Sequence, residues 1–573
     1  MAGGGGGHAR RAAALEVHDH PRARPRRAAH HPAPARRAVD LQLQGPLPPR
    51  RGTAVTAGAG AAPGLLAIDL GTESARVAVY GPEGTLLGES ASGYPTSYPR
   101  PGWAEQNPED WWGAVVTATR AAHAAAGAPP LAGVAVATTA STVAVLDAAG
   151  RPLRPALLWM DSRASVESAD TAACTHPVLR YAGGGDAVEW LVPKAMWLAR
   201  HEPDTYRAAA RITEAVDYLV WRLTGEWAGS QMNAVCKWNH DPLGGGLPED
   251  LYAAFGVPDL REKLPGRIVP VGDPIAPLGP AAREELGIAQ AAVVSSGGID
   301  AHLSLLAVGG PRAGRVSVVS GTSTAFVTEI DEPVFPPTVW GPYPDALSRG
   351  RWLIEGGQVT SGSVLTWVGE QLLGRPRERL PELIARAAAL PPGDHGLVVL
   401  DYFMGNRTPL RDPRLRGAVL GLTAGTLPEE VYRAAVEGVA YGTRQVLESF
   451  VAGGVPVDEV FVSGGIRHNP LWLRATADAV GRPLRLVRGG NLTLRACAVI
   501  AAAGVGGGAA RLNELAAAFA PEFELVEPDP GTQDRYERGY ADYLLATEAT
   551  RPVAHRLSAP DRALGSSPAG RRP

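Results

Sequence analysis

Two short segments of the sequence contain residue types that suit phosphate binding. Gly71 and Thr72 follow the apolar residues 65–68, and Gly321 and Thr322 follow the apolar residues 316–319. Glycine-containing turns can direct several backbone N–H groups at a phosphate, because no Cβ blocks its approach. Asp69 stands just before the first turn, where its carboxylate could hold Mg²⁺ directly or through water, since this ion prefers oxygen ligands and keeps several waters. The pattern indicates chemistry on a phosphate group.

A single turn of this kind also has a purely structural explanation. Asp and Gly are common in hairpin turns for conformational reasons, so one DxGT segment indicates a turn more readily than a binding site. The second copy, 250 positions after the first, favours the phosphate site. The sequence contains neither a G-x-x-x-x-G-K-[ST] segment nor a strand-linked G-x-G-x-x-G segment with its acidic partner, so it predicts neither a P-loop nor a dinucleotide site.

Each turn is expected to join two apolar strands, within a chain that alternates strands with helices. Periodicity predicts strands at residues 134–137, 143–146 and 459–462, and helices at residues 193–201, 206–223, 429–451, 470–480 and 494–504. Such alternation is typical of an α/β fold, and the repeated strand–turn–strand unit predicts two lobes of similar plan. The expected boundary is the pair Gly297 and Gly298, with the active cleft beside residues 299–302.

Composition restricts the classes of partner. The 573 residues are 45% hydrophobic and 20% charged, which is ordinary for a globular chain, and no uncharged stretch is apolar enough to span a bilayer. Net charge is −3, but the first 62 residues carry ten Arg against three acidic residues, so the remainder is acidic and argues against nucleic acid. The three cysteines have no CxxC spacing, which favours a reducing, cytoplasmic location over a disulfide-bonded one.

The two ends differ from the body in composition. Residues 1–62 are rich in Ala, Gly, Pro and Arg, without the apolar segment of a secretory signal. We interpret them as a disordered or spurious basic extension; a transit peptide is the alternative, although four prolines would interrupt its amphipathic helix. Residues 549–573 are expected to form a flexible tail.

Several longer segments extend the pattern. They are DLGTESAR at 69–76, PGWAEQNP at 101–108, WMDSR at 159–163, PKAMWL at 193–198, GAVLGLTAGTLPEEVYRAAVE at 417–437 and SGGIRHNP at 463–470. On these residues the chain resembles the FGGY family of carbohydrate kinases, from Gly64 to about Leu545. Residues 417–437 fit the family's C-terminal signature at every specified position, whereas the N-terminal signature around Lys194 departs from it at Leu191. The segments VCKW at 235–238, DAH at 300–302, EGGQ at 355–358 and FMGNRTP at 403–409 most resemble the ribulokinases, in particular the D-ribulokinase-like branch.

The resemblance implies two actin-like lobes of the sugar kinase and chaperone ATPase superfamily, with an interlobe catalytic cleft. Residues 63–298 would form the N-terminal lobe, which binds sugar and phosphate, and residues 299–548 the C-terminal lobe, which binds the nucleotide. The implied enzyme is an ATP-dependent phosphotransferase with an alcohol group as acceptor, acting on the terminal hydroxyl of a ketopentose, D-ribulose first. ATP and Mg²⁺ are the implied cofactors, the sugar and ATP are the implied partners, and a homodimer is left open.

The resemblance also implies roles for individual residues. Asp300 matches the catalytic base, which accepts the proton of the sugar hydroxyl; without the resemblance, a helix N-cap would be the favoured explanation. Ala140, Lys237, Asp300 and Glu355 match positions that bind the ketose. The positions that match the nucleotide and phosphate site are Asp69, Gly71, Thr72, Ser74, Arg76, Gly321, Thr322, Ser323, Gly464, Gly465 and Asn469, with Asp69 as the residue that would hold Mg²⁺ through water.

The rarity of lysine supports the sugar site independently. Only Lys194, Lys237 and Lys263 are lysines among 55 basic residues, so arginine is the usual cation of this chain. A lysine therefore indicates a position where the compact ammonium fits and the larger guanidinium does not. The alternative explanation for Lys237 is that it is a surface lysine present by chance, without a role in binding.

One departure from the family pattern leaves the substrate open. Thr138 stands where ribulokinase-like members usually carry an acidic residue, so L-ribulose, xylulose and polyols remain alternatives to D-ribulose. A protein of a different functional class, an actin-like or chaperone-like ATPase without a sugar substrate, would have the same fold. A former kinase that binds sugar but no longer phosphorylates it would also have this fold. Lys237, Asp300 and Glu355 would have no purpose in a filament protein, and the intact phosphate and base positions argue against lost catalysis.

Overall fold

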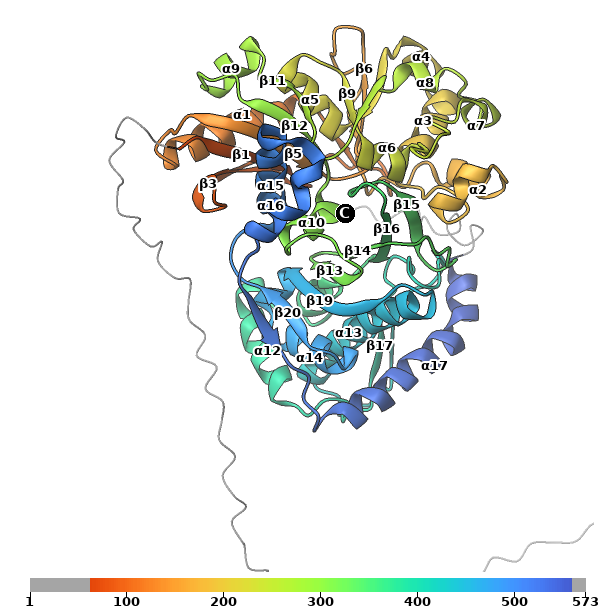
Figure 1. The fold of residues 1–573 in the computed structure, drawn as a ribbon. Coiled ribbons are helices and arrows are strands. Elements are labelled where there is room, and N and C mark those ends of the chain that lie inside the picture. Colours follow the sequence, from red (N-terminus) through yellow and green to blue (C-terminus); the bar gives the residue numbers. More distant parts are fainter. Residues whose placement is uncertain (1–61, 559–573) are drawn as a thin grey trace, which may run out of the picture. The chain divides into compact units, whose positions relative to one another are not determined.

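The computed structural model describes residues 62–558. The extension predicted over residues 1–62 lies outside this range except for its last residue, as does the predicted tail after Ser558. The described residues form two α/β lobes, each built around one large sheet (Figure 1).

The first sheet has six strands in the order β11-β12-β5-β1-β2-β3. Strand β1 pairs antiparallel with β2 and parallel with β5, and β5 pairs parallel with β12. The strands are β1 (Gly64–Leu70), β2 (Ser74–Tyr80), β3 (Leu86–Gly93), β5 (Leu131–Thr138), β11 (Pro274–Pro277) and β12 (Val293–Ile299).

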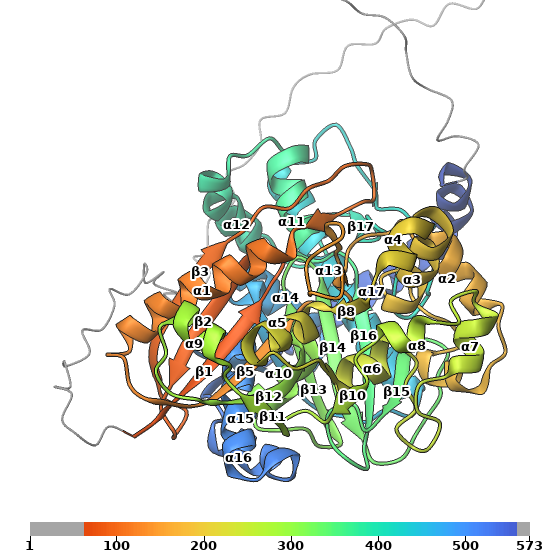
Figure 2. The ribbon, with the colours of Figure 1, turned by 90° about the horizontal axis from the view of Figure 1, so that it is seen from above.

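Both faces of β1 are buried, which explains why its sequence is apolar apart from Asp69. Leu66 and Ile68 belong to the core under α1 (Pro108–Ala125) and α5 (Ala215–Thr224), which overlie the sheet in Figure 2. Leu65 and Ala67 belong to the opposite core, together with α15 (Leu492–Gly506). Gly133 in β5 allows α15 to pack closely, because a Cβ there would lie 2.6 Å from the carbonyl oxygen of Ala501.

The second sheet repeats this plan with seven strands in the order β15-β16-β14-β13-β19-β20-β21. Strand β13 pairs antiparallel with β14 and parallel with β19, as β1 pairs with β2 and β5. The predicted α/β fold of two similar lobes is therefore confirmed. The strands are β13 (Gly314–Ser320), β14 (Thr324–Ile330), β15 (Trp340–Pro344), β16 (Trp352–Gln358), β19 (Val457–Gly464), β20 (Leu484–Val487) and β21 (Phe523–Val526), and the main helices beside them are α12 (Leu380–Ala389), α13 (Pro428–Ala452), α14 (Pro470–Val480) and α17 (Gln533–Leu557).

Two helices pass from one lobe to the other. Helix α10 (Asp300–Ala307) follows β12 of the first sheet and lies at the junction of the lobes, where it packs chiefly against α15 and also against β13 and β14 of the second sheet. Helix α15 follows β20 of the second sheet but packs against β1, β5 and β12, so it lies among the elements of the first lobe, as does α16 (Leu512–Ala518) (Figure 1). The domain ranges 63–298 and 299–548 stay a prediction. A single boundary in the sequence assigns α15 and α16 to the second lobe, although both lie among the elements of the first.

A smaller subdomain lies beside the first sheet and has its own apolar core. It contains the four-stranded sheet β4-β7-β6-β8 and the helices that carry one wall of the site described below. These elements are β4 (Glu105–Gln106), β6 (Val143–Leu146), β7 (Ala156–Leu157), β8 (Arg211–Glu214), α2 (Ser165–Ala172), α3 (Leu191–His201), α4 (Pro203–Ala208), α6 (Gln231–Lys237), α7 (Glu249–Ala254) and α8 (Leu260–Lys263).

The prediction of one helix over residues 206–223 is wrong for residues 211–214, which form a strand. The chain forms α4, then strand β8, and only then α5. Residues 211–214 pair with β6, and this tertiary pairing outweighs the local helical periodicity.

Helix α17 extends further than expected from the sequence. It continues through Pro552 to Leu557, into the segment predicted as a flexible tail from residue 549. Ala554 is buried and the His555 side chain pairs with Asp412, so packing against the second lobe accounts for the added turns.

The remaining elements are short or peripheral. They are α9 (Pro280–Leu286), α11 (Gly362–Trp367), the pair β9 (Ala228–Ser230) and β10 (Arg267–Val269), and the pair β17 (Val398–Leu400) and β18 (Ala418–Leu420). Within residues 62–558, no helix combines the length and apolar character needed to cross a bilayer.

Deleting residues 1–54 is expected to leave sugar phosphorylation unchanged, because the first buried strand begins only at Gly64. Specific activity of the shortened and full-length chains would be compared at equal protein concentration. Deletion of residues 1–70, which removes β1 from the centre of the first sheet, is the matched control and should abolish soluble protein. A large loss of soluble, active protein on removing only residues 1–54 would show that they belong to the fold.

Candidate active site

The first Gly-Thr turn places Asp69 at the carboxyl end of β1. The Gly71 N–H donates to the carbonyl of Ser74 at 3.1 Å, which closes the β1–β2 hairpin, and the Tyr94 hydroxyl donates to the Gly71 carbonyl. The indole N–H of Trp159 donates to Thr72 Oγ1 at 3.1 Å. These bonds hold the turn from both sides and connect it to the aromatic wall of the pocket described below.

Asp69 has one oxygen paired and one oxygen unpaired. Its Oδ2 accepts from Arg76 Nη1 at 3.1 Å and from Asn491 Nδ2 at 2.9 Å, whereas the buried Oδ1 has no hydrogen-bond partner among the described residues. Burial raises the pKa of the Asp69 carboxyl, and Arg76 and Asn491 oppose that shift. A buried carboxylate oxygen left without a partner is the kind of group that a hydrated divalent cation can satisfy.

The sequence analysis did not identify Asn491. It is the N-cap of α15, the helix that returns to the first lobe, and it lies 422 positions from Asp69 in the chain. The only local signal is a helix-capping Asn after Gly489 and Gly490, which predicts a helix start but not its neighbour.

The second Gly-Thr turn is supported by a segment that was also missed. The Gly321 N–H donates to the Ser323 carbonyl at 2.8 Å, as in the first hairpin. Residues 361–363, at the start of α11, donate to this turn: the Ser361 N–H to the Thr322 carbonyl and the Gly362 N–H to the Gly321 carbonyl, both at 3.0 Å. The small residues of this Ser-Gly-Ser segment allow the close approach.

Gly464 and Gly465 lie beside the second turn. Gly464 ends β19 with φ +84°, and a Cβ there would lie 2.6 Å from the carbonyl oxygen of Ser320. Asn469 Oδ1 accepts from the Trp472 N–H at 3.1 Å and so caps α14, while its Nδ2 donates to the Tyr432 hydroxyl at 3.2 Å. The structure therefore gathers the predicted nucleotide residues of the second lobe at the carboxyl ends of β13 and β19, although the Asn469 amide already has structural partners.

Asp300 is the first residue of α10 and lies close enough to Asp69 for the charge of Asp69 to shift its pKa. The N-cap position belongs to Ile299, so the capping explanation does not hold. Within residues 62–558, the Asp300 Oδ1 accepts only from the neighbouring Ala301 N–H, at 2.7 Å. Burial, and next the charge of Asp69, raise the pKa of Asp300 to about 7. A carboxylate with such a pKa can take up a proton near neutral pH.

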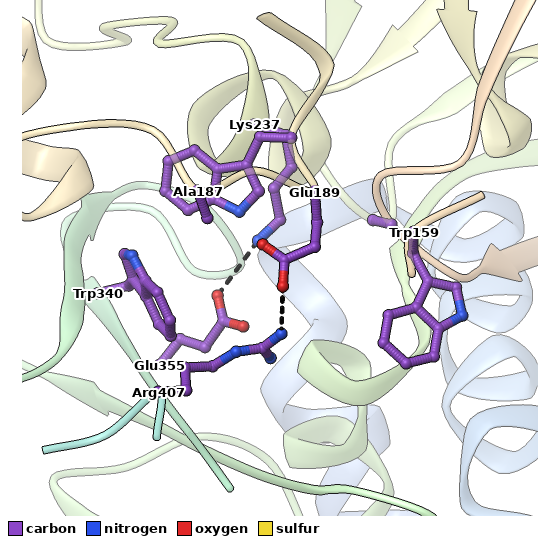
Figure 3. A pocket seen from close by; sticks show the side chains of 9 residues that line it. Trp159, Ala187, Glu189, Lys237, Trp340, Glu355 and Arg407 are labelled. Carbon is purple, nitrogen blue, oxygen red and sulfur yellow. Dashed lines mark hydrogen bonds and ion pairs between the residues drawn. The ribbon is translucent and has the colours of Figure 1, made fainter. Parts of the chain in front are cut away.

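A cavity lies between the lobes and brings together Ala140, Lys237 and Glu355. Figure 3 shows Lys237 and Glu355 in it. The other side chains that line it are Trp159, Ala187, Glu189, Trp190, Trp340 and Arg407. Asp300 does not line the cavity, but His302, two residues later on α10, reaches Glu355 with its Nε2 at 3.2 Å.

Charge in this cavity is balanced by ion pairs between the lobes. Lys237, at the end of α6, lies 3.2 Å from Glu355 Oε2 on β16 and 4.7 Å from the centre of the Trp190 ring. Burial would raise the pKa of Glu355, but Lys237 and then His302 outweigh it and hold that pKa well below its usual range. Glu355 is therefore an ionised acceptor beside a cationic donor, a combination that can bind hydroxyl groups.

Of two further acidic residues, Asp161 and Glu189, one belongs to the cavity. Asp161 is fully buried and forms an ion pair with Arg163 at 2.7 Å, a structural role. Glu189 pairs with Arg407 of the other lobe, also at 2.7 Å, and lines the cavity. Arg407, Trp159 and His302 stood in motif segments, yet nothing local distinguished them from their neighbours.

Lys194 lies beneath the cavity with its ammonium fully buried. Its Nζ donates to the carbonyls of Ser141 and Leu158, both at 2.6 Å, and the residues next to these, Ala140 and Trp159, line the cavity. Burial lowers the pKa of Lys194, and the charges of Asp161 and Glu214 oppose that shift. Lys194 joins the two loops that form one wall.

Replacing Lys194 by methionine is expected to lower the free energy of unfolding by roughly 2–6 kcal/mol, because each of two buried carbonyls loses its donor at a cost of about 1–3 kcal/mol. The sugar KM should rise as the two loops loosen. Urea unfolding and steady-state kinetics would measure both effects. Lys263→Met is the matched control: its ammonium donates to the Ala209 carbonyl, away from the cavity, so stability should fall without a change in sugar KM. Unchanged stability and KM in Lys194→Met would contradict this role.

Family comparisons agree with this geometry. Residues 65–307 match the N-terminal domain, and residues 316–505 the C-terminal domain, of the FGGY family of carbohydrate kinases. The chain belongs to this family. It is therefore an ATP-dependent carbohydrate kinase, a phosphotransferase whose acceptor is an alcohol group, and the alternative of an ATPase without a sugar substrate is set aside.

Individual relatives indicate the branch. The chain is 33% identical to a ribulokinase of Bacillus licheniformis over 390 residues, covering 64% of this chain and 70% of the relative. It is 28% identical to an FGGY carbohydrate kinase domain-containing protein of Xenopus laevis over 527 residues (83% and 95%), and 27% identical to a D-ribulokinase of Saccharomyces cerevisiae over 492 residues (74% and 69%). Among solved structures, this FGGY kinase superposes on a xylulose kinase from Rhodospirillum rubrum with a TM-score of 0.75 at 25% identity, covering 86% of this chain and all of the other. The resemblance to the ribulokinase side of the family is confirmed.

Proposed function

We propose that this FGGY kinase transfers the γ-phosphate of ATP to the terminal hydroxyl of a ketopentose, D-ribulose first, to form D-ribulose 5-phosphate. The observation that supports this most directly is the interlobe cavity, where the matched positions Ala140, Lys237 and Glu355 meet. Three tryptophans provide apolar walls, and the paired cations and carboxylates provide donors and acceptors for an uncharged polyol. Ribulokinases among the curated relatives add support for the choice of sugar.

In the proposed reaction, Asp300 acts as the base. The oxygen of the terminal hydroxyl forms a bond to the γ-phosphorus, the bond from that phosphorus to the bridging oxygen of ADP breaks, and the hydroxyl proton passes to the Asp300 carboxylate. The turns at Gly71 and Gly321, together with Gly464 and Gly465, are proposed to position the phosphates and the nucleotide. Positioning and charge neutralisation then carry most of the rate.

Asp69 fits the role of holding Mg²⁺, because its Oδ1 is buried and has no partner among the described residues. When bound, the ion would neutralise charge on the phosphate oxygens. Arg76 and Asn491 hold the other oxygen and so fix the orientation of the carboxylate.

The choice of sugar is tested by measuring ADP release across ketopentoses, ketohexoses, polyols and aldonates. The highest kcat/KM is expected for D-ribulose, and the phosphorylated carbon would be located by NMR. A clear preference for L-ribulose, xylulose or a pentitol would replace D-ribulose within the same site, whereas a strong preference for an aldonate would contradict the neutral ketose. The cytoplasmic location and the homodimer remain predictions.

A further inference from the structure

Arg407 is held at the cavity by a loop that joins the edge of β16. The Thr408 N–H donates to the Gly357 carbonyl and the Gly357 N–H donates to Thr408 Oγ1, both at 3.1 Å. A Cβ at Gly357 would lie 2.7 Å from the Cδ of Arg407, so the side chain of Arg407 occupies the space that this glycine leaves. Glu355 and Gly357 share one face of the strand, because side chains alternate along it. The arrangement therefore places Arg407 beside Glu355.

The guanidinium of Arg407 pairs with a carboxylate of the other lobe. Its Nη2 donates to Glu189 Oε1 at 2.7 Å, across 218 positions of the chain, and the group lies 5.3 Å from the centre of the Trp340 ring. Burial works against the charge of Arg407, but Glu189 and next Glu355 raise its pKa. The guanidinium therefore stays cationic. Figure 3 shows it beside the carboxylates of Glu189 and Glu355.

An arginine in this setting has unused binding capacity. A guanidinium offers five N–H donors, and the bond to Glu189 is the one side-chain hydrogen bond that Arg407 makes within residues 62–558. Arg407, Glu189 and Glu355 all line the same cavity. A polyhydroxylated ligand needs hydrogen-bond donors next to ionised acceptors, because each of its hydroxyl groups both donates and accepts a hydrogen bond.

We propose that Arg407 is a substrate-binding residue of this pocket, donating to oxygens of the neutral ketose, and that Glu189 is a positioning residue that orients the guanidinium from the first lobe. This inference rests on the proposed function of the same cavity and adds two residues to it. The competing explanation is that the pair only joins the lobes.

A second arginine in the same loop provides the matched control. Arg411 also spans the lobes, because its Nη1 donates to the Gly183 carbonyl at 2.8 Å, and it also lies near Trp340, at 5.4 Å from the ring centre. It does not line the cavity. A contact that merely joins the lobes would make Arg407 and Arg411 equivalent.

The experiment compares Arg407→Lys, Glu189→Gln, their combination and Arg411→Lys with the parent enzyme, using the sugar that the panel above identifies as best. Sugar Kd is followed by quenching of tryptophan fluorescence, since three tryptophans line the cavity. KM for sugar, KM for ATP and thermal melting are measured beside it.

Arg407→Lys is expected to raise sugar Kd and KM more than tenfold, with KM for ATP changed less than twofold. Glu189→Gln should raise sugar KM about three- to tenfold, and the double variant should be no worse than Arg407→Lys, because orienting a guanidinium has no value once it is gone. Arg411→Lys should leave sugar KM within twofold.

Unchanged sugar Kd in Arg407→Lys, or an equal loss in Arg411→Lys, would overturn the proposal. If Arg407→Lys fails to fold, Glu189→Gln alone decides, since unchanged sugar KM in that near-isosteric variant removes the positioning role on which the proposal depends. Failure of the proposed function has a different signature, because the parent enzyme would then phosphorylate no ketose. In that case the variants are compared on the sugar that the parent enzyme does accept.

Discussion

Asp300→Asn is expected to lower kcat at least 100-fold while ATP still binds. The amide keeps the shape of the side chain but cannot accept the proton of the sugar hydroxyl, and general-base contributions are typically about 10²–10⁴-fold. Asp300 lies close enough to Asp69 for the two charges to interact. Arg76 and Asn491 already engage the Asp69 carboxylate, so Asp69 is not placed to replace Asp300 as the base.

ADP release at saturating sugar would measure kcat, and nucleotide binding would be followed by calorimetry. Asp542→Asn, on the exposed face of α17, is the matched control and should be silent. Near-normal turnover in Asp300→Asn would remove this residue from its proposed role.

The same base predicts a pH dependence. Burial, and then the charge of Asp69, raise the pKa of Asp300 to about 7, so the carboxyl is protonated below that pH and ionised above it. Because only the ionised form accepts a proton, kcat/KM should rise with pH through about 7 and level off above it. A profile without this acidic limb would contradict the assignment.

The second large effect is expected at the ion pair of Lys237 and Glu355. Glu355→Gln and Lys237→Arg should each weaken sugar use by roughly 1–3 kcal/mol, the cost of leaving a buried polar partner unmet, while KM for ATP barely changes. Lys237 is 3% exposed and packs against Trp190, so a larger planar guanidinium would intrude on the sugar.

Steady-state kinetics on D-ribulose and its epimer D-xylulose would measure KM and the ranking of the two sugars. Lys263→Arg is the matched control, because Lys263 is also buried but pairs with Asp259 at 3.2 Å, away from the cavity. Unchanged sugar KM and kcat in both pocket variants would contradict the assignment of this pocket and the preference for a ribulose-like substrate.

Much of this kinase could be predicted from local sequence. The apolar strand, Gly-Thr turn and apolar strand at residues 65–80 and again at 316–327 predicted two similar α/β lobes, because strand alternation and turn chemistry act over a few neighbouring residues. The motif segments also carried the family. Lysine rarity drew attention to Lys237 and Lys194, both of which are buried around the cavity.

The contacts that complete the site were decided only by the tertiary structure. Asn491 reaches Asp69 across 422 positions because α15 returns to the first sheet, and Arg407 meets Glu189 across 218 positions because the lobes face each other. Likewise, β8 interrupts a helical pattern because residues 211–214 find a partner in β6. The sequence by itself determined the strands, the turns and the residue types available for chemistry. Which carboxylate pairs with which cation depended on long-range packing, because the burial of these pairs exists only in the assembled fold.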